Sequence, residues 1–224
     1  MSIDLIKINE IFETIQGEGT RTGTPSIFLR LQGCDVGCNF CDTKYTWFLN
    51  SSKIKNINTI LNKVEDNDYY ARIQNLDLQQ LIINKFKSKN IVFTGGEPCL
   101  YNLYDLTKSF EDINYQTQIE TSGTEIIKCH NNTWVTVSPK INMKGGKLLE
   151  EQAINRANEI KFPIGKQKDI AKLKQFIKDY NIYNKVIFLQ PLSQSKKATE
   201  LCIQECYINN WRLSIQTHKY IGLR

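Results

Sequence analysis

The chain has 224 residues, 41% of them hydrophobic and 23% charged, and a formal net charge of +6, values that exclude wholesale disorder and indicate a globular fold. No apolar run approaches the ~20 residues that span a bilayer, and the beginning of the chain, MSIDLIKINE, mixes acidic with apolar residues, unlike a secretion signal. We therefore expect a cytoplasmic protein of one domain, residues 1–224, that binds no membrane.

Short strand-like runs alternate with helical patterns along the chain. Strands are predicted at residues 27–31, 91–94, 116–121, 134–138, 159–163, 185–190 and 212–217, and helices at 76–87, 103–110, 147–155, 168–180 and 197–210. This alternation predicts a parallel sheet with crossover helices. Because the chain is shorter than the ~250 residues of a complete eight-fold barrel, we expect an α/β fold, a partial, open parallel β/α barrel of about six strands. Its active site is expected at the carboxyl ends of the strands.

Two polar stretches have simple interpretations. Residues 50–75 are rich in Asn, Lys and Asp and lack a clear period, which predicts a variable insertion with a weak helix around 57–64. Lysines concentrate between Lys140 and Lys178, but they interleave with Ile170, Leu173, Phe176 and Ile177 at helical spacing. That pattern is typical of a solvated helix face, and the sequence carries no nucleic-acid-binding motif, so we expect no nucleic-acid partner.

Cys34, Cys38 and Cys41 form a C-x3-C-x2-C cluster shortly after the strand predicted at 27–31. Seven cysteines are an odd number in a chain without a secretion signal, which argues against a disulfide framework. A tetrahedral zinc site, the alternative, would need a fourth protein ligand, and the remaining cysteines form no second short-spaced cluster near it. Three sulfurs instead suit a [4Fe–4S] cluster whose fourth iron is open to a ligand.

A second motif, Thr94-Gly95-Gly96-Glu97-Pro98, ends the strand predicted at 91–94, where two glycines allow the backbone to approach a ligand closely. Both motifs resemble those of radical S-adenosylmethionine (SAM) enzymes, as does Phe40 just before the third cysteine. The resemblance implies that the open iron chelates SAM and that an electron from the cluster cleaves it to a 5′-deoxyadenosyl radical. It also implies that the Gly-Gly-Glu-Pro turn contacts the SAM amino group.

Sequence blocks around these motifs resemble the 7-carboxy-7-deazaguanine synthase family of queuosine biosynthesis. In chain order they are Phe12-Glu-Thr-Ile-Gln-Gly-Glu-Gly19, Arg30, Cys41-Asp-Thr43, Glu120-Thr-Ser-Gly-Thr124, Ser138-Pro-Lys140, Leu189-Gln-Pro-Leu192 and Gln216-Thr-His-Lys219. The resemblance implies a lyase that converts 6-carboxy-5,6,7,8-tetrahydropterin to 7-carboxy-7-deazaguanine. In this radical-mediated ring contraction ammonia is lost, and the product leads to queuosine and related 7-deazapurines.

The same resemblance assigns roles to individual residues. Substrate contacts are expected from Ile15, Gln16, Gly17, Glu18, Arg30, Thr94, His218 and Arg224, the last through its terminal carboxylate. SAM contacts are expected from Phe40, Cys41, Asp42, Gly96, Ser138, Pro139, Lys140, Gln190, Pro191, Leu192 and Ser193. The cluster would be held by Cys34, Cys38 and Cys41. The hydroxyl of Thr43 would bind Mg2+, an ion that keeps several waters and takes few protein ligands; a helix-capping hydroxyl is the alternative.

The resemblance also implies partners: a small-molecule pterin, a flavodoxin-like or other low-potential reductant, and a second copy of the chain in a homodimer. Two other functions stay open. Another small radical SAM enzyme, such as a glycyl-radical activase, would share the cysteine and glycine motifs, whereas an iron–sulfur electron carrier would share only the cysteines. Cys202 and Cys206, four residues apart on a predicted helix, are interpreted as small buried hydrophobes.

Overall fold

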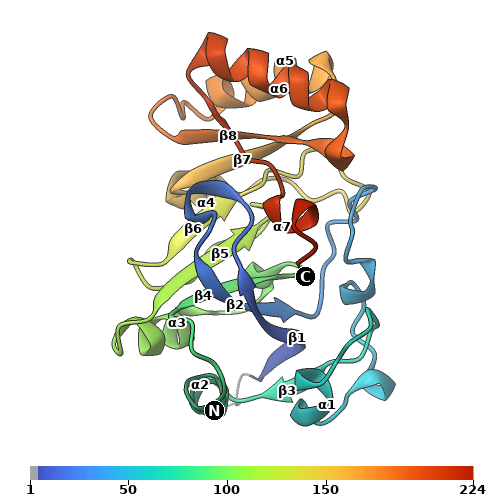
Figure 1. Ribbon diagram of the computed structural model, residues 1–224, viewed down its shortest axis with the longest axis vertical. Coiled ribbons are helices and arrows are strands. Elements are labelled where there is room, and N and C mark those ends of the chain that lie inside the picture. Colours follow the sequence, from blue (N-terminus) through green and yellow to red (C-terminus); the bar gives the residue numbers. More distant parts are fainter. Residues whose placement is uncertain (1–4, 224) are drawn as a thin grey trace.

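One mixed sheet forms the centre of the protein (Figure 1). The structure, a computed structural model, describes residues 5–223, and within them nine strands lie in the order β3-β1-β2-β4-β5-β6-β7-β8-β9. Their bounds are β1 (Ile6–Ile15), β2 (Pro25–Leu31), β3 (Ala71–Ile73), β4 (Asn90–Gly95), β5 (Gln116–Thr121), β6 (Trp134–Val137), β7 (Glu159–Ile164), β8 (Val186–Pro191) and β9 (Arg212–Leu213). Neighbouring strands from β2 to β9 are parallel, whereas β1 is antiparallel to both β2 and β3. Because β3 and β9 stand at opposite edges, the barrel is open, and the predicted partial parallel barrel is confirmed.

Helices and short turns connect the strands, and four of the helices, α3 to α6, pack on neighbouring strands of the sheet. The helices are α1 (Ile57–Leu61), α2 (Asn75–Lys85), α3 (Tyr104–Glu111), α4 (Glu151–Arg156), α5 (Gln167–Asp179), α6 (Lys196–Asn209) and α7 (Thr217–Tyr220), with 3-10 turns η1 (Gly19–Arg21), η2 (Lys44–Thr46), η3 (Ser51–Lys53), η4 (Pro98–Leu100) and η5 (Leu192–Gln194). The helix α3 packs on β5, α4 on β6, α5 on β7 and α6 on β8. Figure 1 shows α5 and α6 at one end of the sheet, α2 and α3 toward the other, and α7 between them. Within residues 5–223, no helix combines the length and the apolar character that crossing a membrane demands.

The strand β7 shows how the sequence fills both sides of the sheet. Its residues Ile160 and Phe162 belong to the hydrophobic core beside the buried apolar face of α5. Successive side chains of a strand point to opposite faces, so Glu159 and Lys161 share the other face. Both are buried, at 0% and 5% exposure. The interior of the open barrel is therefore lined with polar groups at this strand, and they must find partners there.

The first strand, β1, was not predicted from the sequence. Its pairing with β2 shifts register between Ile8 and Glu10, which marks a β-bulge or similar irregularity. As a result Asn9, Glu10 and Ile11 are buried one after another. A bulge breaks the alternation of buried and exposed residues by which a strand is recognised.

The segment expected to be an insertion, residues 50–75, joins the edge of the sheet. It contains α1, shorter than the predicted helix, and β3, which pairs with β1. Ile60 and Tyr70 are each 1% exposed. The ammonium of Lys63 donates to Asn9 Oδ1 at 2.6 Å and to the Asn67 carbonyl at 2.7 Å, so a charge from this segment is satisfied inside the fold.

The predicted strand 212–217 is wrong after residue 213. The backbone of Ser214 still bonds to the Leu189 carbonyl at 2.9 Å, but its hydroxyl accepts from Gly19 and the chain leaves the sheet. Thr217 then donates through its backbone nitrogen and its hydroxyl to the Gly17 carbonyl, at 3.1 and 3.0 Å. These tertiary hydrogen bonds turn the last residues into α7, which packs back onto the hairpin between β1 and β2.

Candidate active site

Two adjoining cavities open at the carboxyl ends of the parallel strands. The larger cavity has a volume of about 410 Å3 and the smaller cavity about 180 Å3. Both are lined by Glu18, Asp42, Thr43, Thr94, Glu120, Lys161 and Gln216, which form the boundary between them. Thr94 stands near the end of β4 and Glu120 near the end of β5. Ligands of an open α/β sheet are expected at this edge.

The cysteine loop, residues 33–43, follows β2 and places Cys34, Cys38 and Cys41 on the wall of the larger cavity. Its start is fixed by hydrogen bonds from the Gly33 nitrogen to the Thr46 carbonyl at 2.7 Å and from the Cys34 nitrogen to the Trp47 carbonyl at 3.0 Å. Burial raises the pKa of the Cys34 thiol to about 12 and also raises the pKa of Cys38. These thiols are therefore protonated at neutral pH unless a metal takes the place of the proton.

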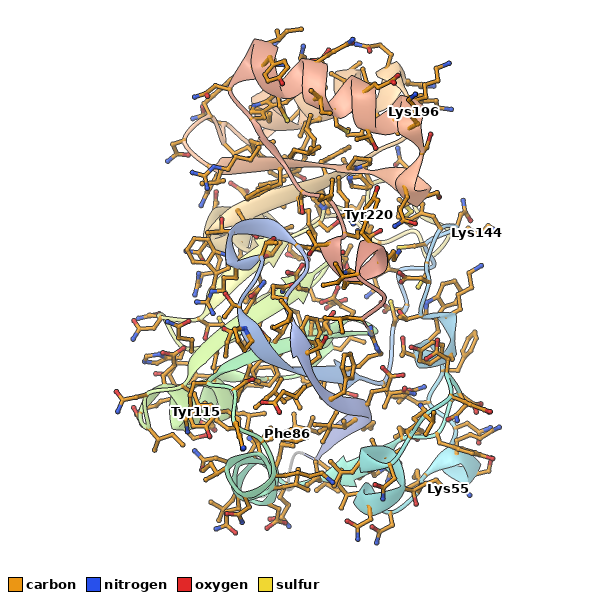
Figure 2. All side chains as sticks on the ribbon, viewed as in Figure 1. Lys55, Phe86, Tyr115, Lys144, Lys196 and Tyr220 are labelled. Carbon is orange, nitrogen blue, oxygen red and sulfur yellow. The ribbon has the colours of Figure 1, made fainter. Side chains whose placement is uncertain are left out.

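A second loop, between β6 and α4, holds the cysteine loop in place. The nitrogen of Gly145 donates to the Val36 carbonyl at 3.1 Å, and a Cβ at Gly145 would overlap the carbonyl oxygen of Asp35. The ammonium of Lys147 lies 2.8 Å from the Asp35 carboxylate and 2.7 Å from that of Glu125. The predicted helix 147–155 is wrong at its start: α4 begins at residue 151, and Lys147 lies in the loop before it. Figure 2 labels Lys144, which belongs to this loop.

The three thiols fit an iron–sulfur cluster. Among residues 5–223, no three His, Cys, Asp or Glu side chains gather closely enough to hold a single metal ion. A cluster keeps its thiolate ligands further apart than one ion does, because several irons and sulfides lie between them. All three thiols nevertheless line one cavity, which is the arrangement that a cluster with one open iron requires.

The two glycines of the second motif bring the end of β4 against the cysteine loop. Gly95 has a φ of +125°, a conformation that favours glycine. The Gly96 nitrogen donates to the Leu31 carbonyl at 2.9 Å, and a Cβ on Gly96 would overlap the Gly33 carbonyl oxygen. These contacts account for both glycines through close packing, and Gly96 also lines the larger cavity.

The acidic residue of this motif, Glu97, is a buried organiser that sequence reasoning left without a role. It is 1% exposed and accepts hydrogen bonds from the Cys99 nitrogen at 3.0 Å and the Thr121 hydroxyl at 2.6 Å. Its other oxygen accepts from the Ser122 nitrogen at 2.9 Å and from the Ser122 hydroxyl. One carboxylate thus ties the ends of β4 and β5 together. The sequence did hold a signal for this role, because an acidic residue between two glycines and a proline directly follows a buried strand.

Ten of the eleven residues predicted to contact SAM line the larger cavity. They are Phe40, Cys41, Asp42, Gly96, Ser138, Lys140, Gln190, Pro191, Leu192 and Ser193, whereas Pro139 does not line it. The ammonium of Lys140 donates to the carbonyl and hydroxyl of Ser138, at 2.9 and 2.5 Å, and lies 5.9 Å from the centre of the Phe40 ring. Burial lowers the pKa of Lys140. Lys140 therefore places a polar side chain beside the cysteine loop, where its charge lowers the pKa of Cys38 against the effect of burial.

Most of the residues predicted to contact substrate line the smaller cavity. They are Ile15, Gln16, Glu18, Arg30, Thr94 and His218. Gly17 does not line it but packs directly under His218, and Arg224 lies outside the described residues. The amide nitrogen of Gln16 is buried and has no hydrogen-bond partner within the described chain. A buried donor of this kind is costly unless a ligand or water accepts from it.

Arg30 stands over an aromatic floor in the smaller cavity. Its Nε donates to Glu10 Oε2 at 2.7 Å, and the Tyr45 hydroxyl donates to the other oxygen of Glu10 at 3.2 Å. The guanidinium lies 6.0 Å from the centre of the Phe12 ring, which stacks on Phe28 at 5.5 Å with an interplanar angle of 16°. The structure thus provides a flat apolar surface beside a cation. Sequence reasoning found Arg30 but not the two aromatic rings.

Thr43 lies where the two cavities meet. Its hydroxyl is 3.6 Å from the Cys41 sulfur and 3.4 Å from the Gly95 carbonyl, to which it donates. Both contacts are long for hydrogen bonds, so the hydroxyl is only weakly engaged by the protein. It precedes η2, but its side chain does not cap that turn.

A buried charge network separates the two cavities and was not predicted as a unit. The ammonium of Lys161 pairs with Glu18 and lies 2.7 Å from Glu120 Oε2. Burial alone would raise the pKa of Glu18, but the charge of Lys161 lowers it to about 2. Burial raises the pKa of Glu120, and Lys161 offsets only part of that rise. Lys161 itself has its pKa raised because two carboxylates outweigh its burial. Sequence reasoning had named Glu120 only as part of a family-like sequence block and had not found Lys161.

Comparison with known proteins agrees with this geometry. A family model described as a 4Fe-4S single cluster domain matches residues 15–147. The chain is 51% identical over 219 residues to the 7-carboxy-7-deazaguanine synthase of Buchnera aphidicola subsp. Schizaphis graminum (strain Sg), covering 97% of this chain and 98% of that one. It is 47% identical over 218 residues to the enzyme of the same name from Escherichia coli (strain K12), covering 96% and 98%. The crystal structure of QueE from Escherichia coli matches with a TM-score of 0.92 and 46% identity, over 95% of this chain and 94% of that one.

Proposed function

This chain belongs to the 7-carboxy-7-deazaguanine synthase family, and from this premise we propose how its two cavities divide the work of a radical SAM enzyme. The reaction converts 6-carboxy-5,6,7,8-tetrahydropterin to 7-carboxy-7-deazaguanine with loss of ammonia, in the biosynthesis of queuosine and related 7-deazapurines. The observation that carries the proposal is the pair of adjoining cavities at the strand ends. One has three thiols on its wall, and the other has an unpartnered amide donor beside an arginine.

The larger cavity is the proposed site of the cluster and SAM. When bound, these two groups supply the radical chemistry of the family. The chain itself contributes Cys34, Cys38 and Cys41 as ligands, and the predicted SAM residues surround the space next to them. Glu97 holds the ends of β4 and β5 in register under this space. Of the three thiols, that of Cys38 is buried and the other two are half-buried. Because burial raises the pKa of Cys34 and Cys38, metal binding there must displace their protons.

The smaller cavity is the proposed site of the pterin. The amide of Gln16 donates to an acceptor on the ring, which removes the cost of its missing partner. Arg30 binds the substrate carboxylate, a task that suits its planar guanidinium. The guanidinium lies over the Phe12 ring, which stacks on Phe28. His218 closes the side of the cavity nearest to the C-terminus. These contacts place the substrate beside Thr94 and Thr43, at the boundary with the larger cavity.

Several finer assignments rest on the family resemblance. We assign Mg2+ to Thr43, whose weakly held hydroxyl faces both cavities and leaves room for substrate oxygens and waters. A homodimer, a flavodoxin-like reductant and a cytoplasmic location complete the proposal. A glycyl-radical activase and an electron carrier have no comparable support, because the full-length relatives share the name of the synthase.

Anaerobic reconstitution with iron, sulfide, SAM and dithionite tests the proposal. The wild-type protein should form 5′-deoxyadenosine and, with the tetrahydropterin present, 7-carboxy-7-deazaguanine. Replacing Cys34 by Ala should abolish both products together with the brown chromophore, whereas Cys206→Ala, a half-buried cysteine of α6, should leave them unchanged. SAM cleavage without any deazaguanine product in the wild type would contradict the assignment of the smaller cavity.

A further inference from the structure

One lysine links the two cavities. Lys161 projects from β7 into the boundary between them, where its side chain is only 7% exposed. It pairs with Glu18, which follows β1, and with Glu120, which stands on β5. Both carboxylates also line both cavities. Three distant parts of the chain therefore meet at one ammonium group.

The two carboxylates have different second partners. Glu18 Oε1 accepts from the Gln216 amide at 2.8 Å and from the Gln190 amide at 3.3 Å, so it is tied to the C-terminal segment and to β8. Glu120 Oε1 accepts from the Gln118 amide at 2.8 Å, within β5. A displacement of either carboxylate changes the place of the ammonium that they share. Since Glu18 pairs with this ammonium and binds Gln216, a shift of the ammonium also moves the C-terminal segment that carries His218.

We propose that Lys161 is a positioning residue: through its two ion pairs it sets the places of Glu18 and Glu120, and so couples the filling of the larger cavity to substrate binding in the smaller one. The proposal rests on the function proposed above. Two buried carboxylates share one ammonium at this boundary, and a buried charge is costly unless it is compensated. A charged ligand that enters either cavity therefore changes the balance between Lys161 and its two carboxylates.

Removing the ammonium should change how activity depends on pH. Glu18, Glu120, Lys140 and His218 interact with the charge of Lys161, and Glu159 in turn interacts with Glu120. With Lys161 present, the pKa of Glu18 is about 2 and the group stays ionised throughout the neutral range. Without it, burial raises the pKa of Glu18, which then takes up a proton as the pH falls toward that value. The charge of Lys161 also lowers the pKa of His218 and of Lys140, so its removal raises both pKa values. Glu18 and His218 then move the acidic side of the pH profile in the same direction, and the profile therefore reports on the whole network around Lys161.

The test compares K161M, K161R and the control K185M in the full-length reconstituted protein. Lys185 donates to the carbonyls of Asn155 and Ala157 at 2.7 and 2.6 Å, at the opposite ends of the strands from the cavities. We expect K161M to raise the ratio of 5′-deoxyadenosine to deazaguanine product by at least about tenfold and to raise the KM for the pterin by about 10²-fold. In the plot of K161M activity against pH, the loss of activity on the acidic side should move to higher pH. K161R should restore most of the coupling, and K185M should behave as the wild type.

A second measurement does not depend on the loaded enzyme. In cluster-free protein, the Tm of K161M relative to the wild type should fall further as the pH rises from 5 to 8, because two buried carboxylates then ionise without a counter-charge. If K161M does not fold, K161M/E120Q, which removes one of those charges, takes its place in both measurements. Wild-type coupling and an unmoved loss of activity on the acidic side in the folded variant would overturn the proposal. Loss of product in the wild type itself would instead overturn the proposed function.

Discussion

Replacing Gly17 by Ala should move His218 away from the smaller cavity. A Cβ at this position would overlap His218 Nδ1 and lie 3.0 Å from both its Cγ and its backbone nitrogen. Ordinary van der Waals contact begins at 3.4 Å, so the turn that carries His218 must retreat. A shift of about 1 Å in a group that contacts substrate costs about 10²-fold in kcat/KM. The two hydrogen bonds from Thr217 to the Gly17 carbonyl weaken as well, and the loss of each lowers the free energy of unfolding by about 1 kcal/mol.

The assay is steady-state turnover of the pterin, with 5′-deoxyadenosine measured in the same samples. We expect G17A to raise the KM for the pterin while the iron content and the pterin-independent cleavage of SAM stay near wild type. The matched control is Gly23→Ala in the same hairpin. Gly23 has a φ of +91° and nothing within 4 Å of a new Cβ, so Ala there strains the hairpin by about 1–2 kcal/mol without touching His218.

A double variant separates the steric cause from general damage. Removing the imidazole with H218A deletes the group that the new methyl would meet. G17A should therefore add little to the defect of H218A alone, since mutations that act on one contact are not additive. A G17A enzyme with wild-type KM, or one no worse than the Gly23 control, would refute the proposed contact between His218 and the substrate.

Three further predictions follow from the site. Thr43→Ala should weaken the stimulation of turnover by Mg2+ while iron content and SAM cleavage are retained; unchanged magnesium dependence would return Thr43 to a packing role. Glu97→Gln should lower the free energy of unfolding by about 2–4 kcal/mol in a denaturant titration, because one amide N–H must then face the backbone N–H of Ser122 or Cys99. Extending the chain beyond Arg224 by a Gly-Ser tag should raise the KM for the pterin severalfold, because α7 lies against the hairpin at the smaller cavity; an unchanged KM would mean that the C-terminus does not reach the substrate.

The sequence was most informative where a strand, a motif and a turn follow one another without interruption. The strand β5 has the predicted bounds, 116–121, and the cysteine and glycine motifs lie at the strand ends where they were expected. Prediction stopped where tertiary contacts decide the structure. The bulge in β1 hides its alternation, and the end of the predicted last strand becomes α7 because the Gly17 carbonyl binds Thr217.

The charge network shows a different limit. Glu18, Glu120 and Lys161 come from three elements that no local pattern connects, so only the folded barrel reveals that they meet. A partial signal was present: Glu159 and Lys161 alternate with apolar Ile160 and Phe162 in a strand with neighbours on both sides. Charged residues at alternate positions of an interior strand indicate a polar lumen. They do not say which carboxylate each charge will find.

The contacts of Gly145 and Lys147 with the cysteine loop affect when that loop can fold during synthesis of the chain. The cysteine loop lies in the first fifth of the chain, and nearby residues fix its start, but the contacts that hold Asp35 and Val36 come from the loop after β6. A ribosome must therefore complete well over half of the protein before that loop can take its final shape. Contacts between parts so distant in sequence form late, because the cost of closing the intervening loop comes first. We expect the three thiols to stay accessible to iron delivery for most of translation. The larger cavity around them should form only afterwards.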